Sequence, residues 1–100
     1  MKDFRTFNTA VSFYRLSLTL KLCGTLKEQL SRAASSVVLN LGEGRGKDSR
    51  KDQLRFFSIA RGSLRECQAI LILANLEDSE AWAVLDKAAA QLHCLIKNAV

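Results

Sequence analysis

The chain has 100 residues, of which 48% are hydrophobic and 25% charged, and this composition excludes an intrinsically disordered protein. A chain of this length has room for one hydrophobic core, so we expect a single domain over residues 1–100. Fifteen basic residues against ten acidic ones give a net charge of +5, which favours polyanionic partners such as RNA, DNA or an acidic protein.

The cysteines and the N-terminal segment bear on the cellular compartment. Cys23, Cys67 and Cys94 form no CxxC pair and are accompanied by one histidine, so the sequence predicts neither a disulfide framework nor a zinc site. Free cysteine is usually a small buried hydrophobe, and we expect buried thiols in a reducing compartment. The segment after Met1 lacks the apolar run of a signal peptide, and no stretch approaches the length of a membrane span. We therefore expect a cytoplasmic protein with no membrane partner.

Residues 4–22 have the apolar spacing of a helix with two separate apolar stripes. The main stripe consists of Phe7, Val11, Tyr14, Leu18 and Leu22, and the second stripe of Phe13, Leu16 and Leu20. Two apolar stripes indicate that the helix packs against two different partners. One interpretation is that the main stripe faces the chain's own core and the second forms an oligomer interface. The other is a helix wedged between two helices of its own bundle.

A second helix is expected over residues 26–41. Glycine is the usual residue just past a helix C-terminus, so Gly24 places the end of the first helix at residues 23–24. Thr25 and Glu28 then fit a capping box, in which each side chain binds the backbone N–H of the other. The core face of this helix comprises Leu26, Leu30, Ala33, Ala34, Val37 and Leu41.

Residues 42–46 contain three of the five glycines and are expected to form a loop. Gly46-Lys47 resembles the end of a phosphate-binding P-loop, but the flanking residues differ and a helix precedes the segment where the motif requires a strand. The glycine spacing also fails to match the dinucleotide-binding fingerprint. Free backbone N–H groups of these glycines and of the start of the next helix, beside Arg45, Lys47 and Arg50, predict a simple anion site instead.

The third helix is expected to begin after Asp48 or Ser49, both good N-cap residues, and to continue to about residue 75. One face is basic, and Asp52 and Glu66 are the only acidic residues on this helix. Such a face is compatible with simple solvation and with phosphate binding. Gly62, in the middle of the helix, is expected to mark a close helix crossing. With the preceding loop, the candidate nucleic-acid-binding residues are Arg45, Lys47, Arg50, Lys51, Arg55, Arg61 and Arg65.

A fourth helix is expected after a cap at Asp78 or Ser79, with its apolar stripe running from Trp82 to Ile96. No strand pattern is present, and all three connections are short. Four helices joined by short loops predict an all-α fold, an antiparallel up-down four-helix bundle.

The segment from Gln29 to Glu66 resembles, without gaps, the four-helix-bundle family of the bacterial 23S rRNA intervening-sequence proteins. The family pattern is Q-L-x-R-A-A-x-S-I/V, then N-I-A-E-G, then G, a basic residue and S, and finally F-x-x-I/L-A-x-G-S-L-x-E. The chain reads QLSRAASSV at 29–37, NLGEG at 40–44, GKDS at 46–49 and FFSIARGSLRE at 56–66. Gly42 replaces the family's alanine, so the second helix is expected to end one residue early. The first connection is unusually short and lacks the proline often seen there.

This resemblance implies a small bundle that assembles into a ring, with a pentamer favoured. It also implies a distant similarity to the accessory proteins of diversity-generating retroelements, whose basic barrels bind nucleic acid.

Three functions are compatible with the sequence. The first is a nucleic-acid-binding accessory module, foremost for structured RNA, in which arginines contact phosphates rather than read bases. The second is a self-assembling scaffold or protein-interaction module that binds no nucleic acid. The third is an enzyme, for which Glu43 and Glu66 are the only plausible acids and no nucleophile–base pair or metal cluster is present. We therefore predict no catalytic residue, no metal, no cofactor and no small-molecule substrate.

The residues Asn40, Glu43, Gly44 and Glu66 are assigned a structural or interface role around the turn. Asparagine near a helix C-terminus is a common cap. Glu43 is expected to pair with Arg61 or Arg65 across the turn. A direct part for Asn40 and Glu43 in binding or assembly remains the alternative.

Overall fold

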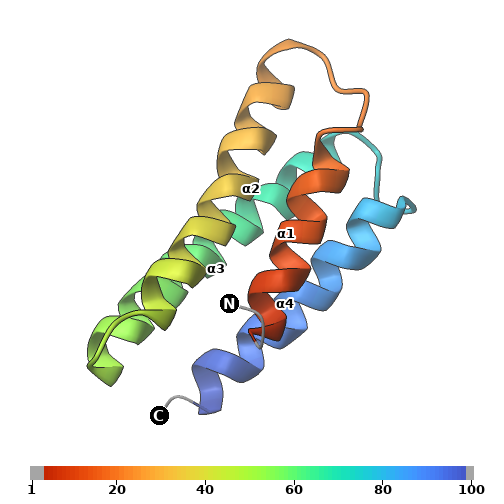
Figure 1. Cartoon of the computed structure of the whole chain (residues 1–100). Helices are drawn as coiled ribbons and strands as arrows, with labels where there is room; N and C mark the ends of the chain where they lie inside the picture. The colour runs from red at the N-terminus through yellow and green to blue at the C-terminus, as the bar shows by residue number, and fades with distance from the viewer. Residues whose placement is uncertain (1–3, 99–100) are drawn as a thin grey trace.

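Four helices make up the computed structural model, which describes residues 4–98. They are α1 (Arg5–Ser17), α2 (Gly24–Arg45), α3 (Arg50–Leu73) and α4 (Glu80–Asn98), and no strand occurs in the described part of the chain. Consecutive helices run in opposite directions, and the start of α1, the α2–α3 turn and the end of α4 lie at the lower end of the bundle (Figure 1). Helices α1 and α3 each pack against both α2 and α4. The predicted all-α, up-down four-helix bundle is confirmed.

The core is a column of aliphatic and aromatic side chains to which every helix contributes. Phe13 of α1, Leu41 of α2, Leu64 of α3 and Leu85 of α4 are each at most 2% exposed. Burying a side chain of this kind stabilises a fold by roughly 1.5–3 kcal/mol. Contacts among all four helices therefore hold the bundle together, and no single helix is dispensable to the core.

Helix α1 contributes residues of both predicted apolar stripes to the core. Phe13 is 1% exposed, so its predicted role as an oligomer contact is wrong: the ring fills the protein's own core. Leu16 and Leu20, the other two predicted interface residues, are partly buried against the same core. Of the predicted main stripe, Leu18 is 50% exposed. Phe7, Tyr14 and Leu22 of the main stripe also pack against the core, and α1 contacts both α2 and α4, so the alternative of a helix wedged between two helices of its own bundle is confirmed.

Helix α1 also ends earlier than expected, at Ser17 rather than at residue 22. The hydroxyls of Ser17 and Thr19 donate hydrogen bonds to the carbonyls of Tyr14 and Leu16. The backbone N–H groups of Thr19 and Leu20 then bind carbonyls three residues back, as in a 3-10 turn, instead of four. Hydroxyl side chains that compete for carbonyls in this way favour helix ends. The apolar periodicity continues beyond Ser17 because the residues of the connection still cover the core.

Helix α2 is longer than predicted at both ends. It begins at Gly24, whose φ of +50° lies in the left-handed region that favours glycine, and its N-cap is Cys23. Thr25 thus lies inside the helix, and the predicted capping box is not its N-cap. At the other end α2 continues through Gly42 and Gly44 to Arg45. The predicted glycine loop is therefore mainly the last turn of a helix, and Gly42 does not shorten it.

The three cysteines are free thiols, as predicted, but only Cys67 is buried. Burial, together with the nearby charge of Glu66, raises the pKa of the Cys67 thiol to about 12. Its reactive thiolate form is therefore not populated near neutral pH. Cys23, in the α1–α2 connection, and Cys94, on α4, are exposed, so the expectation that all three are buried is wrong.

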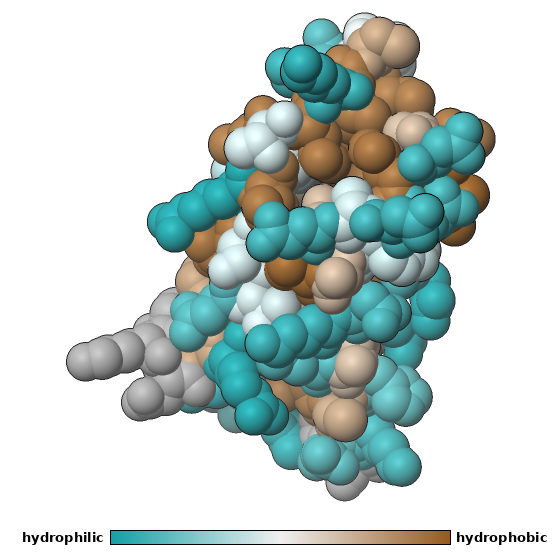
Figure 2. Space-filling view, turned by 90° about the vertical axis from the view of Figure 1, so that its right-hand side faces the viewer, coloured by the Kyte–Doolittle hydropathy of each residue, from teal (hydrophilic) through white to brown (hydrophobic). Residues whose placement is uncertain are grey.

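The surface carries apolar side chains at positions that the core leaves uncovered. Hydrophobic atoms gather towards the upper end of the face shown in Figure 2, and hydrophilic atoms cover most of its lower end. A groove of about 430 Å³ lies between α1 and α2, and Leu39 beside it is 69% exposed. We call it the α1–α2 groove; its apolar lining consists of Val11, Tyr14, Leu18, Val38 and Leu39. Among the described residues, no helix is long and apolar enough to cross a membrane.

Candidate nucleic-acid interface

The end of α2 packs closely against the start of α3 at Gly44. A Cβ atom placed on this buried residue would lie 2.7 Å from Cε1 of Phe57 and 3.1 Å from Cβ of Phe56. Carbon atoms at these distances overlap, so the contact requires glycine. Nothing lies within 4 Å of a Cβ at Gly62, which is exposed. The close helix crossing is therefore at Gly44 and not at Gly62, where we expected it.

The backbone N–H groups of the glycine segment already have acceptors. The N–H of Gly46 donates to the carbonyls of Gly42 and Glu43, at 3.3 and 3.2 Å, and that of Lys47 to the carbonyl of Gly44 at 3.2 Å. These bonds close the last turn of α2. The amides of Gly46 and Lys47 are thus not free, whereas those of Arg50 and Lys51 at the start of α3 have no acceptor among the described residues, so the anion site stays a prediction.

The α2–α3 turn is fixed by side chains that bind its backbone. The hydroxyl of Ser49 accepts a hydrogen bond from the N–H of Asp52 at 3.1 Å, which confirms Ser49 as the N-cap of α3. Gln53 Nε2 donates to the carbonyl of Lys47 at 3.1 Å. The first turn of α3 is therefore tied to the end of α2, and the position of the basic residues around it is defined.

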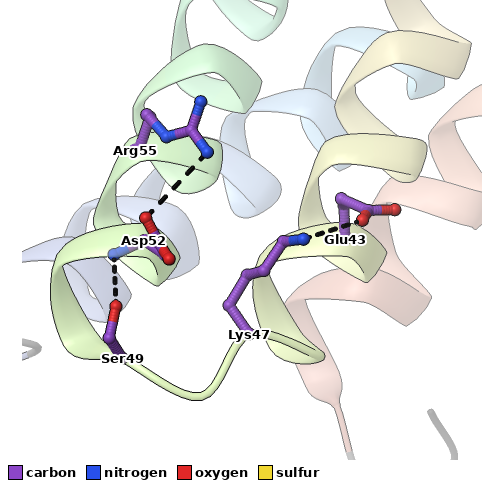
Figure 3. Close-up of polar contacts among 5 residues, drawn as sticks. All are labelled: Glu43, Lys47, Ser49, Asp52 and Arg55. Carbon is purple, nitrogen blue, oxygen red and sulfur yellow. Dashed lines mark hydrogen bonds and ion pairs between the residues drawn. The ribbon is translucent and has the colours of Figure 1, made fainter.

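Two cations of the turn have acidic partners (Figure 3). Nζ of Lys47 lies 3.3 Å from Oε2 of Glu43, one helical turn before it, and Nη2 of Arg55 lies 3.9 Å from Oδ1 of Asp52. Glu43 was expected to pair with an arginine of α3; the longer α2 instead brings Lys47 within its reach. Both pairs are exposed to solvent, and such pairs contribute only about 0–1 kcal/mol. A phosphate can therefore replace either carboxylate at little cost.

An aromatic ring lies between these two cations. Nζ of Lys47 is 5.1 Å and Cζ of Arg55 is 4.8 Å from the centroid of the Phe56 ring. Cation–π contacts of this kind keep side chains in place without neutralising their charge. The ring thus holds two positive groups beside the turn in defined positions.

Three further cations of α3, one before Arg55 and two after it, have no partner among the described residues. Lys51, Arg61 and Arg65 form no hydrogen bond or ion pair with any described residue; Lys51 and Arg65 are exposed and Arg61 partly so. On a helical projection of 100° per residue, Lys51 and Arg65 face away from the core residues of α3, whereas Arg61 lies at the edge of the core face, about 60° from Leu64. We call these three residues the α3 basic face.

Two predicted binding residues, Arg45 and Arg50, lie at a different place. They line a cleft of about 710 Å³ at the lower end of the bundle, between the start of α1, the α2–α3 turn and the end of α4. Arg5 lines the same cleft and was missed by the sequence analysis. The up-down topology alone would have placed the start of α1 beside the α2–α3 turn. We call this feature the terminal cleft; its lining includes Phe4, Arg5, Arg45, Arg50, Cys94 and Leu95.

Among the described residues, neither Asn40 nor Glu66 forms a hydrogen bond or ion pair with a cation of the interface. Asn40 lies inside α2 rather than at its end, so it is not a cap; its Nδ2 donates to the carbonyl and hydroxyl of Ser36, at 2.9 and 3.1 Å. The Ser36 hydroxyl in turn lies 2.7 Å from that of Ser63 on α3. Asn40 is therefore part of a polar link between α2 and α3. Glu66 is exposed and acts on its neighbour Cys67 through charge.

No group of three or more His, Cys, Asp or Glu side chains is placed to hold a metal ion within residues 4–98. A family model described as 23S rRNA-intervening sequence protein matches residues 5–97. A comparison with curated proteins finds no significant match. The match covers nearly the whole chain, whereas the motifs recognised in the sequence span residues 29–66.

Proposed function

The chain belongs to the family of the 23S rRNA-intervening sequence proteins, and on this basis we propose that it is a non-enzymatic, homo-oligomeric, cytoplasmic protein that binds structured RNA. The observation that carries the proposal is the α3 basic face. Lys51, Arg61 and Arg65 have no acidic partner among the described residues, so their charge is available to phosphates. Arg55 and Lys47 add two cations whose exposed ion pairs exchange readily.

The chemistry of these residues favours contacts to the phosphate backbone over reading of bases. Guanidinium and ammonium groups bind phosphate oxygens irrespective of sequence, and each contact releases counterions from the nucleic acid. Nothing in the sequence resembles a base-reading motif. The family name points to RNA, and we therefore propose recognition of a folded RNA with little sequence preference.

We expect the unmodified protein to bind a structured RNA with an affinity that falls steeply as salt is added. Three phosphate contacts predict a slope of log affinity against log salt of about −2 to −3. Fluorescence anisotropy over a series of KCl concentrations measures the slope, and light scattering with and without RNA gives the molar mass of the complex. If neither RNA nor DNA binds at low salt, the proposal is wrong and a scaffold without nucleic acid takes its place.

Self-assembly is the second component of the proposal, and the α1–α2 groove favours it. With Phe13 in the core, this groove is the apolar surface that α1 presents outward, and Leu18 and Leu39 beside it are 50% and 69% exposed. Contiguous exposed apolar surface of this kind marks contact sites. We propose that a second copy of the chain covers it and that repetition of the contact forms a ring, with a pentamer favoured by the family resemblance.

Replacing Leu39 with glutamate is expected to weaken assembly without unfolding the chain. Burying a leucine contributes roughly 1.5–3 kcal/mol, and a buried unpaired carboxylate would add a further penalty, so each contact should weaken at least about tenfold. Leu73→Glu is the matched control, because Leu73 is 71% exposed and lies outside the groove. Light scattering should show smaller species for Leu39→Glu alone. A monomeric unmodified protein, or equal effects of the two changes, would contradict assembly through the groove.

A further inference from the structure

The terminal cleft collects positive charge from three separate elements. Arg5 comes from α1, Arg45 from the end of α2 and Arg50 from the start of α3, and no acidic residue lines the cleft among those that the structure describes. The convergence is a property of the fold, because Arg5 is 40 positions from Arg45 and 45 from Arg50 in the sequence. Unlike the cations beside Phe56, these arginines pair with no carboxylate of a described residue.

Two of the three guanidinium groups are held in place by neutral groups. Cζ of Arg45 lies 4.8 Å from the centroid of the Phe4 ring. Arg50 donates from Nη2 to the carbonyl of Asn98 at 3.3 Å and from Nη1 to Oε1 of Gln53 at 3.1 Å. These contacts orient the planar groups but leave their full positive charge, which is the arrangement that binds an anion with little further loss of side-chain freedom.

We propose that the terminal cleft binds the phosphate of a nucleoside 5′-monophosphate, as the 5′-phosphorylated end of an RNA strand. A terminal phosphate carries about −1.5 to −2 charges near neutral pH and three acceptor oxygens, which matches three guanidinium donors better than a singly charged internal phosphodiester does. The volume of about 710 Å³ lies within the range of small-molecule sites. Apolar lining from Phe4, Ala90 and Leu95 provides a wall for the nucleoside.

Arg50 of the cleft lies on the same side of α3 as Arg61 of the α3 basic face, and the inference rests on the proposed function. At 100° per residue, Arg50 and Arg61 lie about 20° apart on the projection of α3 and so share one side of the helix. At 1.5 Å per residue they are about 17 Å apart along its axis. Arg50 reaches the carbonyl of Asn98 on α4 from this side. An RNA strand that follows Arg65 and Arg61 towards the start of α3 therefore arrives at the terminal cleft.

The cysteines provide a direct readout of the cleft. Cys94 is exposed and lines it, Cys23 is exposed in the α1–α2 connection at the other end of the bundle, and Cys67 is buried. We expect 5′-AMP to slow alkylation of Cys94 by the uncharged reagent iodoacetamide several-fold and to leave the rate at Cys23 unchanged, as followed by peptide mass spectrometry. Adenosine, which lacks the phosphate, should protect much less. Unchanged rates at Cys94 with saturating 5′-AMP would overturn the proposal.

A second measurement separates a strand end from a free nucleotide. An RNA oligonucleotide with a 5′-phosphate should bind on the order of tenfold more tightly than the same strand with a 5′-hydroxyl, as expected for one lost charged hydrogen bond or more. Arg5→Gln should reduce this preference, whereas Arg32→Gln should keep it, because Arg32 is an exposed arginine of α2 that lines neither the cleft nor the α1–α2 groove. Protection of Cys94 by 5′-AMP without any preference between the two strands would overturn the strand-end assignment.

The outcome also distinguishes this inference from the proposed function. Normal salt-dependent binding of the 5′-hydroxyl strand, with neither a 5′-phosphate preference nor protection of Cys94, refutes the cleft and leaves the α3 basic face as the RNA site. Failure of both strands to bind at low salt, with Cys94 still protected by 5′-AMP, refutes RNA binding and the strand-end assignment together.

Discussion

Replacing Gly44 with alanine is expected to lower the free energy of unfolding by about 1–3 kcal/mol, the usual cost of forcing an extra carbon into a packed core. The added Cβ would lie 2.7 Å from Cε1 and 2.9 Å from Cδ1 of Phe57. That ring cannot move aside freely, because it is 3% exposed and lies against the Phe4 ring with a centroid distance of 6.3 Å. The change favours helix formation by up to about 1 kcal/mol, which offsets only part of the loss. Urea denaturation followed by circular dichroism measures the effect.

The chain contains a matched control in Gly62. This glycine also lies inside a helix, but a Cβ there meets nothing within 4 Å. Gly62→Ala should therefore stabilise the protein by about 0.4–1 kcal/mol, and the two alanine variants should differ in sign. Phe57→Leu, which removes part of the ring, should make Gly44→Ala less costly than it is in the unmodified chain. Equal stabilisation by both alanine substitutions would show that α2 and α3 are not in close contact at Gly44.

The sequence predicted the number, order and direction of the helices because each segment has a strong apolar periodicity and the connections are short. It did not predict where the helices end, since ends depend on hydrogen bonds that periodicity does not contain. The Ser17 and Thr19 hydroxyls stop α1 early. Gly42 and Gly44 looked like a loop because glycine is poor in an isolated helix. In the bundle, Gly44 is required by the packing of Phe57, and tertiary contact outweighs propensity.

The residues of the candidate site could also be predicted only as far as helix periodicity reaches. Two apolar stripes on α1 could be recognised, but which of their residues reach the core depends on how the helix is rotated in the bundle, so Phe13 was expected at an interface although it is buried. The basic residues of α3 could be assigned to one face from helix geometry alone. Their partners could not: Glu43 pairs with Lys47 only because α2 continues as a helix to Arg45. The terminal cleft could not be predicted without the arrangement of the helices, since Arg5 and Arg50 are 45 positions apart in the sequence.

Replacing both Arg61 and Arg65 with glutamine is expected to weaken RNA binding and to flatten its salt dependence. Loss of two phosphate contacts should reduce the slope of log affinity against log salt by about 1.4–1.8 in magnitude. The fold and the molar mass should stay the same, because neither arginine forms a hydrogen bond or ion pair with a described residue. Anisotropy titrations, circular dichroism and light scattering provide the three readouts.

The control for this variant must remove the same charge from another surface. Lys27 on α2 and Lys87 on α4 are exposed and lie outside the α3 basic face, so Lys27→Gln/Lys87→Gln changes the net charge equally. If binding depends only on the overall positive charge, both double variants should lose affinity to the same extent and with the same change in slope. If the α3 basic face contacts the phosphates, only Arg61→Gln/Arg65→Gln should show the reduction in the slope of log affinity against log salt that is expected for two lost contacts. Charges away from the RNA are screened, so their removal releases few counterions. A matched loss in the two variants would therefore remove α3 as the binding face, whereas a loss confined to the arginine pair would locate the RNA along α3.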